Sequence, residues 1–196
     1  MKKLKDKIFD LKQTSILECA TAYFERFGYE HTKIADIAKD VGMSVGAFYK
    51  VFDSKDVLFN AYIMYQVGQF YDEFKRSIEN ESGYEIKLKE YIRLKFKYYM
   101  QKSNALESSI LSGDPFFYHK AYSGEDNPMQ QVYLLLMDIL GEVLPEKSET
   151  ELKFLAYTFH TMSDGAISLW FEEKIELEKQ VDEIYQLFMH GMRSLI

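Results

Sequence analysis

The chain has 196 residues, of which 28% are charged and 16% aromatic, and it carries a formal net charge of -7 at pH 7. This length fits a small domain joined to a larger one, and the single cysteine, Cys19, excludes an internal disulfide framework. Charged residues interrupt every apolar run before it reaches the roughly eighteen residues of a membrane span. We therefore expect a cytoplasmic protein without an export signal or membrane segment.

The first predicted helix precedes a glycine. Apolar residues recur at helical spacing along one face, which comprises Ile16, Ala20, Phe24 and Phe27. Gly28 then provides a C-terminal stop, because glycine adopts the left-handed backbone conformation at little cost. We therefore expect this face to be buried and the helix to end at Gly28.

Two short helices are predicted next. Thr32 is a candidate N-cap for the first, whose apolar positions are Ile34, Ile37, Ala38 and Val41. Gly42 ends this helix after barely two turns, and Ser44 caps another helix. The residues of that helix expected to face the core are Phe48, Val51 and Phe52. Two short amphipathic helices joined by a tight glycine-containing turn are typical of a helix-turn-helix, whose second helix enters the major groove of DNA.

The segment GYEHTKIADIAKDVGMSVGAFYKVFDSKDVL resembles the N-terminal domain of TetR-family repressors. The matching positions are Phe27-Gly28-Tyr29, Thr32, Ile37-Ala38, Gly42-Met43-Ser44, Gly46, Phe48-Tyr49, Phe52 and Lys55-Asp56-Val57-Leu58. Val51 departs from the pattern, because the family often has His or Tyr at this position. The resemblance implies an all-α protein with a helix-turn-helix DNA-binding domain at residues 1–53. It also implies a larger helical domain at residues 54–196 that binds a ligand and forms a homodimer.

The resemblance and the helix geometry together suggest nine DNA-contacting residues. They are Thr32, Lys33, Ser44, Val45, Gly46, Ala47, Tyr49, Lys50 and Lys55. Most polar members of this set are assigned to phosphates, whereas Val45 and Ala47 offer apolar contact to thymine methyl groups. Gly46 allows the backbone to approach the DNA closely, and Lys50 reaches either a guanine edge or a phosphate.

The negative charge of the chain lies mainly outside this domain. Residues 1–60 carry ten Lys or Arg against nine Asp or Glu, whereas residues 61–196 carry fourteen against twenty-two. The cations that meet phosphates must therefore be grouped, and one group is a leading arm with Lys2, Lys3, Lys5 and Lys7. The arm is expected either to be a frayed, solvated start or to contact the minor groove or phosphates.

The rest of the chain is predicted to be helical. A long helix from about Ser54 to Ile78 joins the two domains. A helix of about twenty residues then carries, among alternating lysines, the apolar residues Ile86, Tyr91, Leu94 and Tyr98. The irregular segment from Gly113 to Gly124 is either a gate over a cavity or a surface loop. Asn127 with Pro128 begins the next helix, and Ser148 with Glu151 forms a capping box for the one after it.

The last two helices are candidates for dimerisation. The penultimate helix has a wide apolar face that comprises Leu152, Leu155, Ala156, Phe159, Met162, Ala166, Leu169 and Trp170. The final helix presents a stripe that we assign to the dimer contact and that consists of Val181, Ile184, Tyr185, Phe188 and Met192. A hairpin of two such helices can form a four-helix bundle with its symmetry mate. Burial in the core of the same chain is a compatible alternative.

The abundance of large adaptable side chains suggests a cavity for a hydrophobic effector. The chain has fifteen Phe, fifteen Tyr and nine Met, which suit the walls of such a cavity. The candidate ligand-binding residues are Tyr91, Phe96, Tyr99, Phe117, Phe159, Met162 and Trp170. Packing in the core is the alternative for each of them.

These features predict a ligand-responsive transcriptional regulator. We expect a repressor that binds a near-palindromic operator in double-stranded DNA, requires no cofactor and is released by a small hydrophobic effector. One alternative is an adaptor that keeps the helix-turn-helix shape but binds another protein. Another is a metal-dependent enzyme, which is disfavoured because His160 and Asp164 lie four residues apart without a metal-binding signature such as HExxH.

Overall fold

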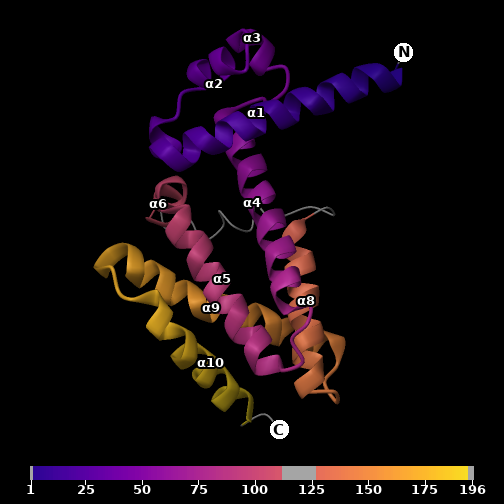
Figure 1. The fold of residues 1–196 in the computed structure, drawn as a ribbon, viewed down its shortest axis with the longest axis vertical. Helices are drawn as coiled ribbons and strands as arrows, with labels where there is room; N and C mark the ends of the chain where they lie inside the picture. Colours follow the sequence, from indigo (N-terminus) through magenta and orange to yellow (C-terminus); the bar gives the residue numbers. More distant parts are fainter. Residues whose placement is uncertain (1, 112–126, 194–196) are drawn as a thin grey trace. The chain divides into compact units, whose positions relative to one another are not determined.

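The computed structural model describes the backbone of residues 2–111 and 127–193, and the side chains of residues 9–107 and 127–191. Regular structure in these residues is α-helical throughout, which confirms the expected fold class (Figure 1). The chain forms two compact units, an N-terminal unit of residues 1–66 and 102–121 and a C-terminal unit of residues 67–101 and 122–196. No helix in the described part is long and apolar enough to cross a membrane.

The N-terminal unit is built around an aromatic core. It contains α1 (Lys2–His31), α2 (Ile34–Asp40), α3 (Val45–Phe48), the first half of α4 (Lys55–Ile78) and α6 (Ser103–Leu111). Phe24 of α1 is fully buried, and its ring centroid lies 5.0 Å from that of Phe59 and 5.4 Å from that of Tyr62 in α4. The unit therefore extends beyond the expected boundary at residue 53, because the start of α4 completes its core.

Gly28 is a kink rather than the end of the first helix. Its φ of 75° and ψ of 170° interrupt α1, which then continues to His31. A Cβ atom at Gly28 would lie 2.8 Å from the carbonyl oxygen of Asn104 in α6, so glycine is also required for this close approach. Phe27, which was expected to share the buried face of α1, is exposed because the kink follows it directly.

The C-terminal unit is a helical bundle whose caps follow the sequence. It contains the second half of α4, α5 (Tyr84–Gln101), α8 (Pro128–Val143), α9 (Glu149–Glu173) and α10 (Leu177–Arg193) (Figure 1). The Asn127 side chain accepts a hydrogen bond of 2.9 Å from the backbone N–H of Met129. Ser148 and Glu151 form the predicted capping box. The expected starts of α8 and α9 are thereby confirmed.

The apolar stripe of α10 lies inside its own chain. Its described members are buried against α5 and α9, and they are Val181, Ile184, Tyr185 and Phe188. The rings of Phe159 and Phe188, for example, have centroids 4.8 Å apart. These four residues therefore form intramolecular core and not the dimer surface assigned to them. The side chain of Met192 lies outside the described residues.

Candidate DNA-binding site

The turn between α2 and α3 is closed by backbone hydrogen bonds. The N–H of Met43 donates to the carbonyl of Ala38 at 2.8 Å, and the N–H of Gly42 donates to that of Lys39 at 3.0 Å. This pair of bonds is the Schellman motif, which requires a left-handed residue at the position of Gly42. Gly42 has a φ of 70°, as the predicted stop of α2 requires. The next residue but one, Ser44, therefore starts α3 from a defined position.

α3 presents one face outward and anchors the other. The Ser44 hydroxyl oxygen accepts a hydrogen bond of 3.2 Å from the N–H of Ala47, which confirms the predicted N-cap. Phe48 and Phe52 are buried beneath the helix. Val45 is 41% exposed and Tyr49 is 45% exposed. Gly46 and Lys50 are also exposed, and Ala47 is half-buried, so the expected outward face of this helix is present.

Thr32 has a different role from the one expected. It is 2% exposed, and its hydroxyl donates a hydrogen bond of 2.7 Å to the carbonyl of Gly28. The N-cap of α2 is Lys33, whose side chain makes no capping bond. Thr32 therefore ties the chain to the kink in α1 and does not present its hydroxyl at the surface. Lys33 is exposed at the start of α2.

Lys55 is held against the end of α1. Its Nζ lies 4.4 Å from the centroid of the Tyr29 ring and donates a hydrogen bond of 3.2 Å to the carbonyl of Glu30. The Tyr29 hydroxyl donates to Asp56, and burial raises the pKa of Tyr29. The ring of Tyr29 thus supports Lys55. The spacing of residues in the sequence did not indicate this role. The position of Tyr29 in the Phe27-Gly28-Tyr29 turn was the only sequence signal for it.

A second tyrosine fixes α2 on α1. The hydroxyl of Tyr23 donates a hydrogen bond of 2.7 Å to Oδ2 of Asp40, the last residue of α2. This bond raises the pKa of Tyr23 to about 12, so the hydroxyl stays protonated at neutral pH. Both ends of α2 are therefore held, by Thr32 at its start and by Asp40 at its end.

The candidate effector residues that the structure describes differ in burial. Tyr91 and Phe159 are buried in the C-terminal unit with ring centroids 5.7 Å apart, and Phe96 is also buried. Tyr99 and Met162 are half-buried. Trp170 contacts Phe171 near the end of α9, and Lys174 lies 4.7 Å from its ring centroid. Phe117 and the segment from Gly113 to Gly124 lie outside the described residues.

The sequence pattern did not reveal a charged network in the same unit. Lys95, one of the alternating lysines of α5, is 3% exposed. Its Nζ donates to Oδ1 of Asp164 at 2.5 Å, to the carbonyl of His160 at 2.7 Å and to the hydroxyl oxygen of Ser163 at 2.9 Å. The Tyr91 hydroxyl is hydrogen-bonded to Nδ1 of His160. These bonds join α5 to α9.

Comparison with known proteins finds a family whose model matches part of the N-terminal unit. Residues 16–62 match the family described as bacterial regulatory proteins, tetR family. A curated relative, the uncharacterized HTH-type transcriptional regulator YfiR of Bacillus subtilis, is 32% identical over 73 residues. That match covers 37% of this chain and 36% of the relative, so the chain aligns with about a third of the relative's length.

Two solved structures share the fold over nearly the whole chain. The fatty acid degradation regulator FadR from Bacillus halodurans superposes with a TM-score of 0.68 at 19% identity, covering 91% of this chain and 98% of that one. FadR from Bacillus subtilis, solved in complex with stearoyl-CoA, gives a TM-score of 0.68 at 18% identity, covering 89% of this chain and 96% of that one. The shared architecture therefore includes the C-terminal unit as well as the helix-turn-helix.

Proposed function

We propose that the whole chain is a ligand-responsive, DNA-binding transcriptional regulator, because residues 16–62 match the tetR family of bacterial regulatory proteins. It acts as a repressor that a hydrophobic effector releases from a near-palindromic operator. Its proposed location is the cytoplasm, where a bacterial regulator meets its operator. No catalytic role is proposed.

The main support for DNA binding is the outward face of α3. Recognition helices of this type contact base edges through their N-terminal residues, and the capped α3 exposes Val45 and Gly46 there. Lys50 is exposed in the turn that follows the helix. Val45 is suited to a thymine methyl group and Lys50 to a guanine edge. Tyr49 and Lys55, beside them, are suited to phosphates, and the support from Tyr29 limits the positions that Lys55 can take.

The proposed homodimer uses the outer faces of α9 and α10. Phe154 and Leu187 are 68% and 66% exposed, and Tyr157 and Leu169 are also exposed on these helices. Large apolar side chains that are exposed on two packed helices support an interface with another protein. A second copy of the chain is the proposed partner, because two helix-turn-helix units related by a two-fold axis match a palindromic site.

The proposed effector binds in the C-terminal unit and has an extended apolar part. The aromatic residues around Tyr91 and Phe159 support this proposal, since they provide an apolar environment in that unit. One structural neighbour was solved with stearoyl-CoA, which makes acyl-chain compounds the first class to screen. An effector releases DNA only if it binds better to the conformation that fits the operator poorly.

The test is selection of binding sites from random duplexes with the full chain. The selected duplex is then titrated by fluorescence anisotropy at several salt concentrations. We expect a near-palindrome whose affinity falls steeply with salt, because cations on the protein displace counterions from phosphates. Failure to enrich any sequence, with weak binding at low salt, would contradict the proposal and favour the protein-binding adaptor.

Two lysine variants separate base recognition from phosphate contact. Lys55→Ala should weaken binding to every duplex and reduce the salt slope by about one unit. Lys50→Ala should alter the selected sequence if Lys50 contacts a base. Lys39→Ala is the matched control, because Lys39 is exposed on α2 and is not assigned to DNA. Equal effects of all three substitutions would contradict these assignments.

A further inference from the structure

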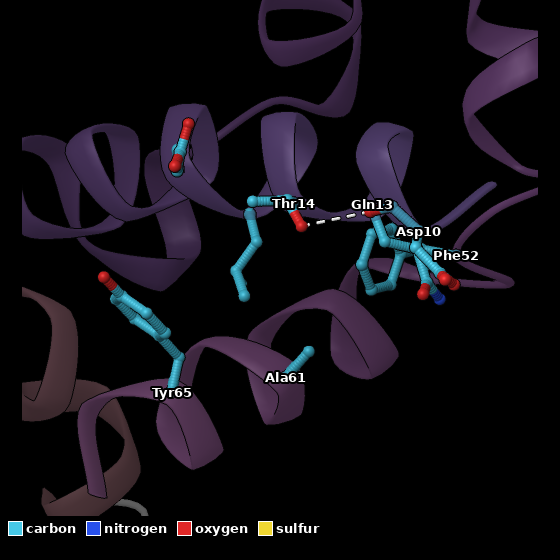
Figure 2. Close-up of a pocket in the computed structure, with 8 residues that line it drawn as sticks. Asp10, Gln13, Thr14, Phe52, Ala61 and Tyr65 are labelled. Carbon is cyan, nitrogen blue, oxygen red and sulfur yellow. Dashed lines mark hydrogen bonds between the residues drawn. The ribbon is translucent and has the colours of Figure 1, made fainter. Parts of the chain in front are cut away.

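A slot-shaped cavity lies between α1 and α4 within the N-terminal unit (Figure 2). Its volume is about 400 Å³. Residues 10–18 of α1 form one wall, and Ala61 and Tyr65 of α4 lie opposite. Figure 2 shows Phe52 near Asp10 at one end and Tyr65 toward the other end. All of its lining residues belong to the N-terminal unit, and none is among the residues assigned to DNA.

The walls of the slot are apolar and its rim is acidic. Leu17, Phe52 and Ala61 contribute hydrocarbon surface, whereas Asp10 and Glu18 contribute carboxylates that are exposed to solvent. Neither carboxylate has an ion-pair partner among the described residues. Among the side chains that the structure describes, none therefore competes with a ligand for these two carboxylates.

The two carboxylates are spaced along the slot. Asp10 and Glu18 are eight residues apart on one helix, which places them roughly 12 Å apart along its axis at 1.5 Å per residue. One aromatic ring accompanies each end of the slot, Phe52 beside Asp10 and Tyr65 toward the opposite end (Figure 2). A carboxylate together with an aromatic ring favours an ammonium group, by ion pairing and by the cation–π interaction.

We propose that this slot binds a linear organic dication, in which an apolar chain carries an ammonium group at each end. The chain lies against Leu17 and Ala61, and the two ammonium groups lie near Asp10 and Glu18. An anion is disfavoured by both carboxylates, and a neutral apolar compound leaves them unpaired. The site is independent of the proposed function, and its test uses no DNA.

The first experiment is calorimetric titration of the full chain at low salt with a series of simple amines. The eight-carbon α,ω-diamine should bind at one site per chain and at least about fivefold more tightly than octylamine, which has one ammonium group. It should also bind more tightly than the four-carbon diamine, which is too short to reach both carboxylates. Equal affinities across the series, preference for octanoate, or absence of binding would overturn the proposal.

Substitutions locate the binding site. Asp10→Asn and Glu18→Gln should each weaken binding of the eight-carbon diamine by about fivefold, as expected for an exposed ion pair. Ala61→Met, which fills the slot, should weaken it by more than about tenfold. Asp36→Asn, an exposed carboxylate on α2, is the control and should change nothing.

If Ala61→Met alters the fold, Asp10→Asn and Glu18→Gln still test the proposal. Asp10 and Glu18 are solvent-exposed, so their neutral isosteres should leave the circular dichroism spectrum unchanged. If these two variants bind the diamine as well as the native chain does, the slot is not its binding site and the proposal is wrong.

Discussion

Lys95 is a charged residue enclosed in the C-terminal unit. An ammonium group has three donors, and all three are used here, by Asp164, Ser163 and the carbonyl of His160. Burial lowers the pKa of Lys95, and the adjacent Asp164 opposes this effect. The side chain of Asp164 is 45% exposed, so the two members of the ion pair differ in hydration. This difference in hydration determines which substitution lowers the free energy of unfolding more.

Loss of Asp164 should destabilise the fold more than loss of Lys95. Asp164→Ala leaves a buried ammonium without its carboxylate, at an expected cost of about 2 kcal/mol. Lys95→Met removes the charge and keeps most of the volume, while the half-exposed carboxylate returns to water, so its cost should be smaller. Urea unfolding of both variants measures the difference. A larger cost for Lys95→Met would contradict the argument.

His160 should make stability fall in mild acid. Burial, and secondly Lys95, hold the pKa of His160 well below its ordinary value, so the folded state keeps the ring neutral. The unfolded chain takes up a proton near pH 6.5, and the free energy of unfolding should therefore fall below that pH, by at most about 1.4 kcal/mol per pH unit. The contribution is fully present above pH 7.

Comparison of the native chain with His160→Gln isolates this effect. Urea unfolding at pH 7 and at pH 5 should show a smaller loss of stability for the variant, because glutamine takes up no proton. His190→Gln is the control, since His190 is exposed on α10. Identical pH dependence in the native chain and in His160→Gln would refute the assignment.

At the scale of elements, the α2–α3 turn is defined more by backbone conformation than by side-chain contacts. Gly42 has a positive φ, and no heavy atom lies within 4 Å of a Cβ placed there. Gly46 has equal space, but its φ lies outside the left-handed region. A side chain therefore fits at both positions, but only Gly42 has a backbone conformation that favours glycine. The two glycines form a matched pair for substitution.

Gly42→Ala should lower the stability of the fold, whereas Gly46→Ala should weaken DNA binding without lowering stability. Gly42→Ala imposes left-handed strain and should lower the free energy of unfolding by about 1 kcal/mol. Gly46→Ala should leave stability unchanged or slightly raised, because alanine favours the helix, yet weaken DNA binding if the backbone approaches the duplex there. Thermal unfolding and anisotropy measure the two effects. A stable Gly46→Ala variant with native DNA affinity would exclude the close approach.

At the scale of the whole molecule, the two units hold different parts of the proposed function. The N-terminal unit carries the exposed face of α3, and the C-terminal unit carries the proposed dimer and effector regions. The stripe on α10 assigned to dimerisation is buried in the chain itself, which moves the proposed contact to the outward residues. A regulator of a palindromic site requires that contact.

Leu187→Glu should prevent dimerisation. Leu187 is 66% exposed on α10, and a carboxylate there would be desolvated in the proposed interface. Sedimentation at micromolar concentration should show a monomer with reduced affinity for the selected palindrome. Leu11→Glu is the matched control, because Leu11 is 65% exposed in the N-terminal unit, and it should remain a dimer. A dimeric Leu187→Glu variant would contradict the proposed surface.

Local signals predicted most of the N-terminal unit. Gly42 and Ser44 mark their turn and cap in the sequence because both roles depend on a residue's own backbone and side chain. Thr32 shows the limit of such signals. A threonine before a helix resembles an N-cap, but its hydroxyl can equally bond a carbonyl four residues earlier, as it does here with Gly28.

The sequence by itself determined the helical class, the helix-turn-helix, the cap of α3 and the face that α3 turns outward, because these follow from spacing and from contacts between near neighbours. Only the tertiary structure decided that Lys95 is enclosed, that the α10 stripe is core, and that α1 and α4 leave a slot between them. An apolar stripe can be buried equally well by its own chain or by a second copy. Which partner covers it depends on packing between elements that are distant in the sequence.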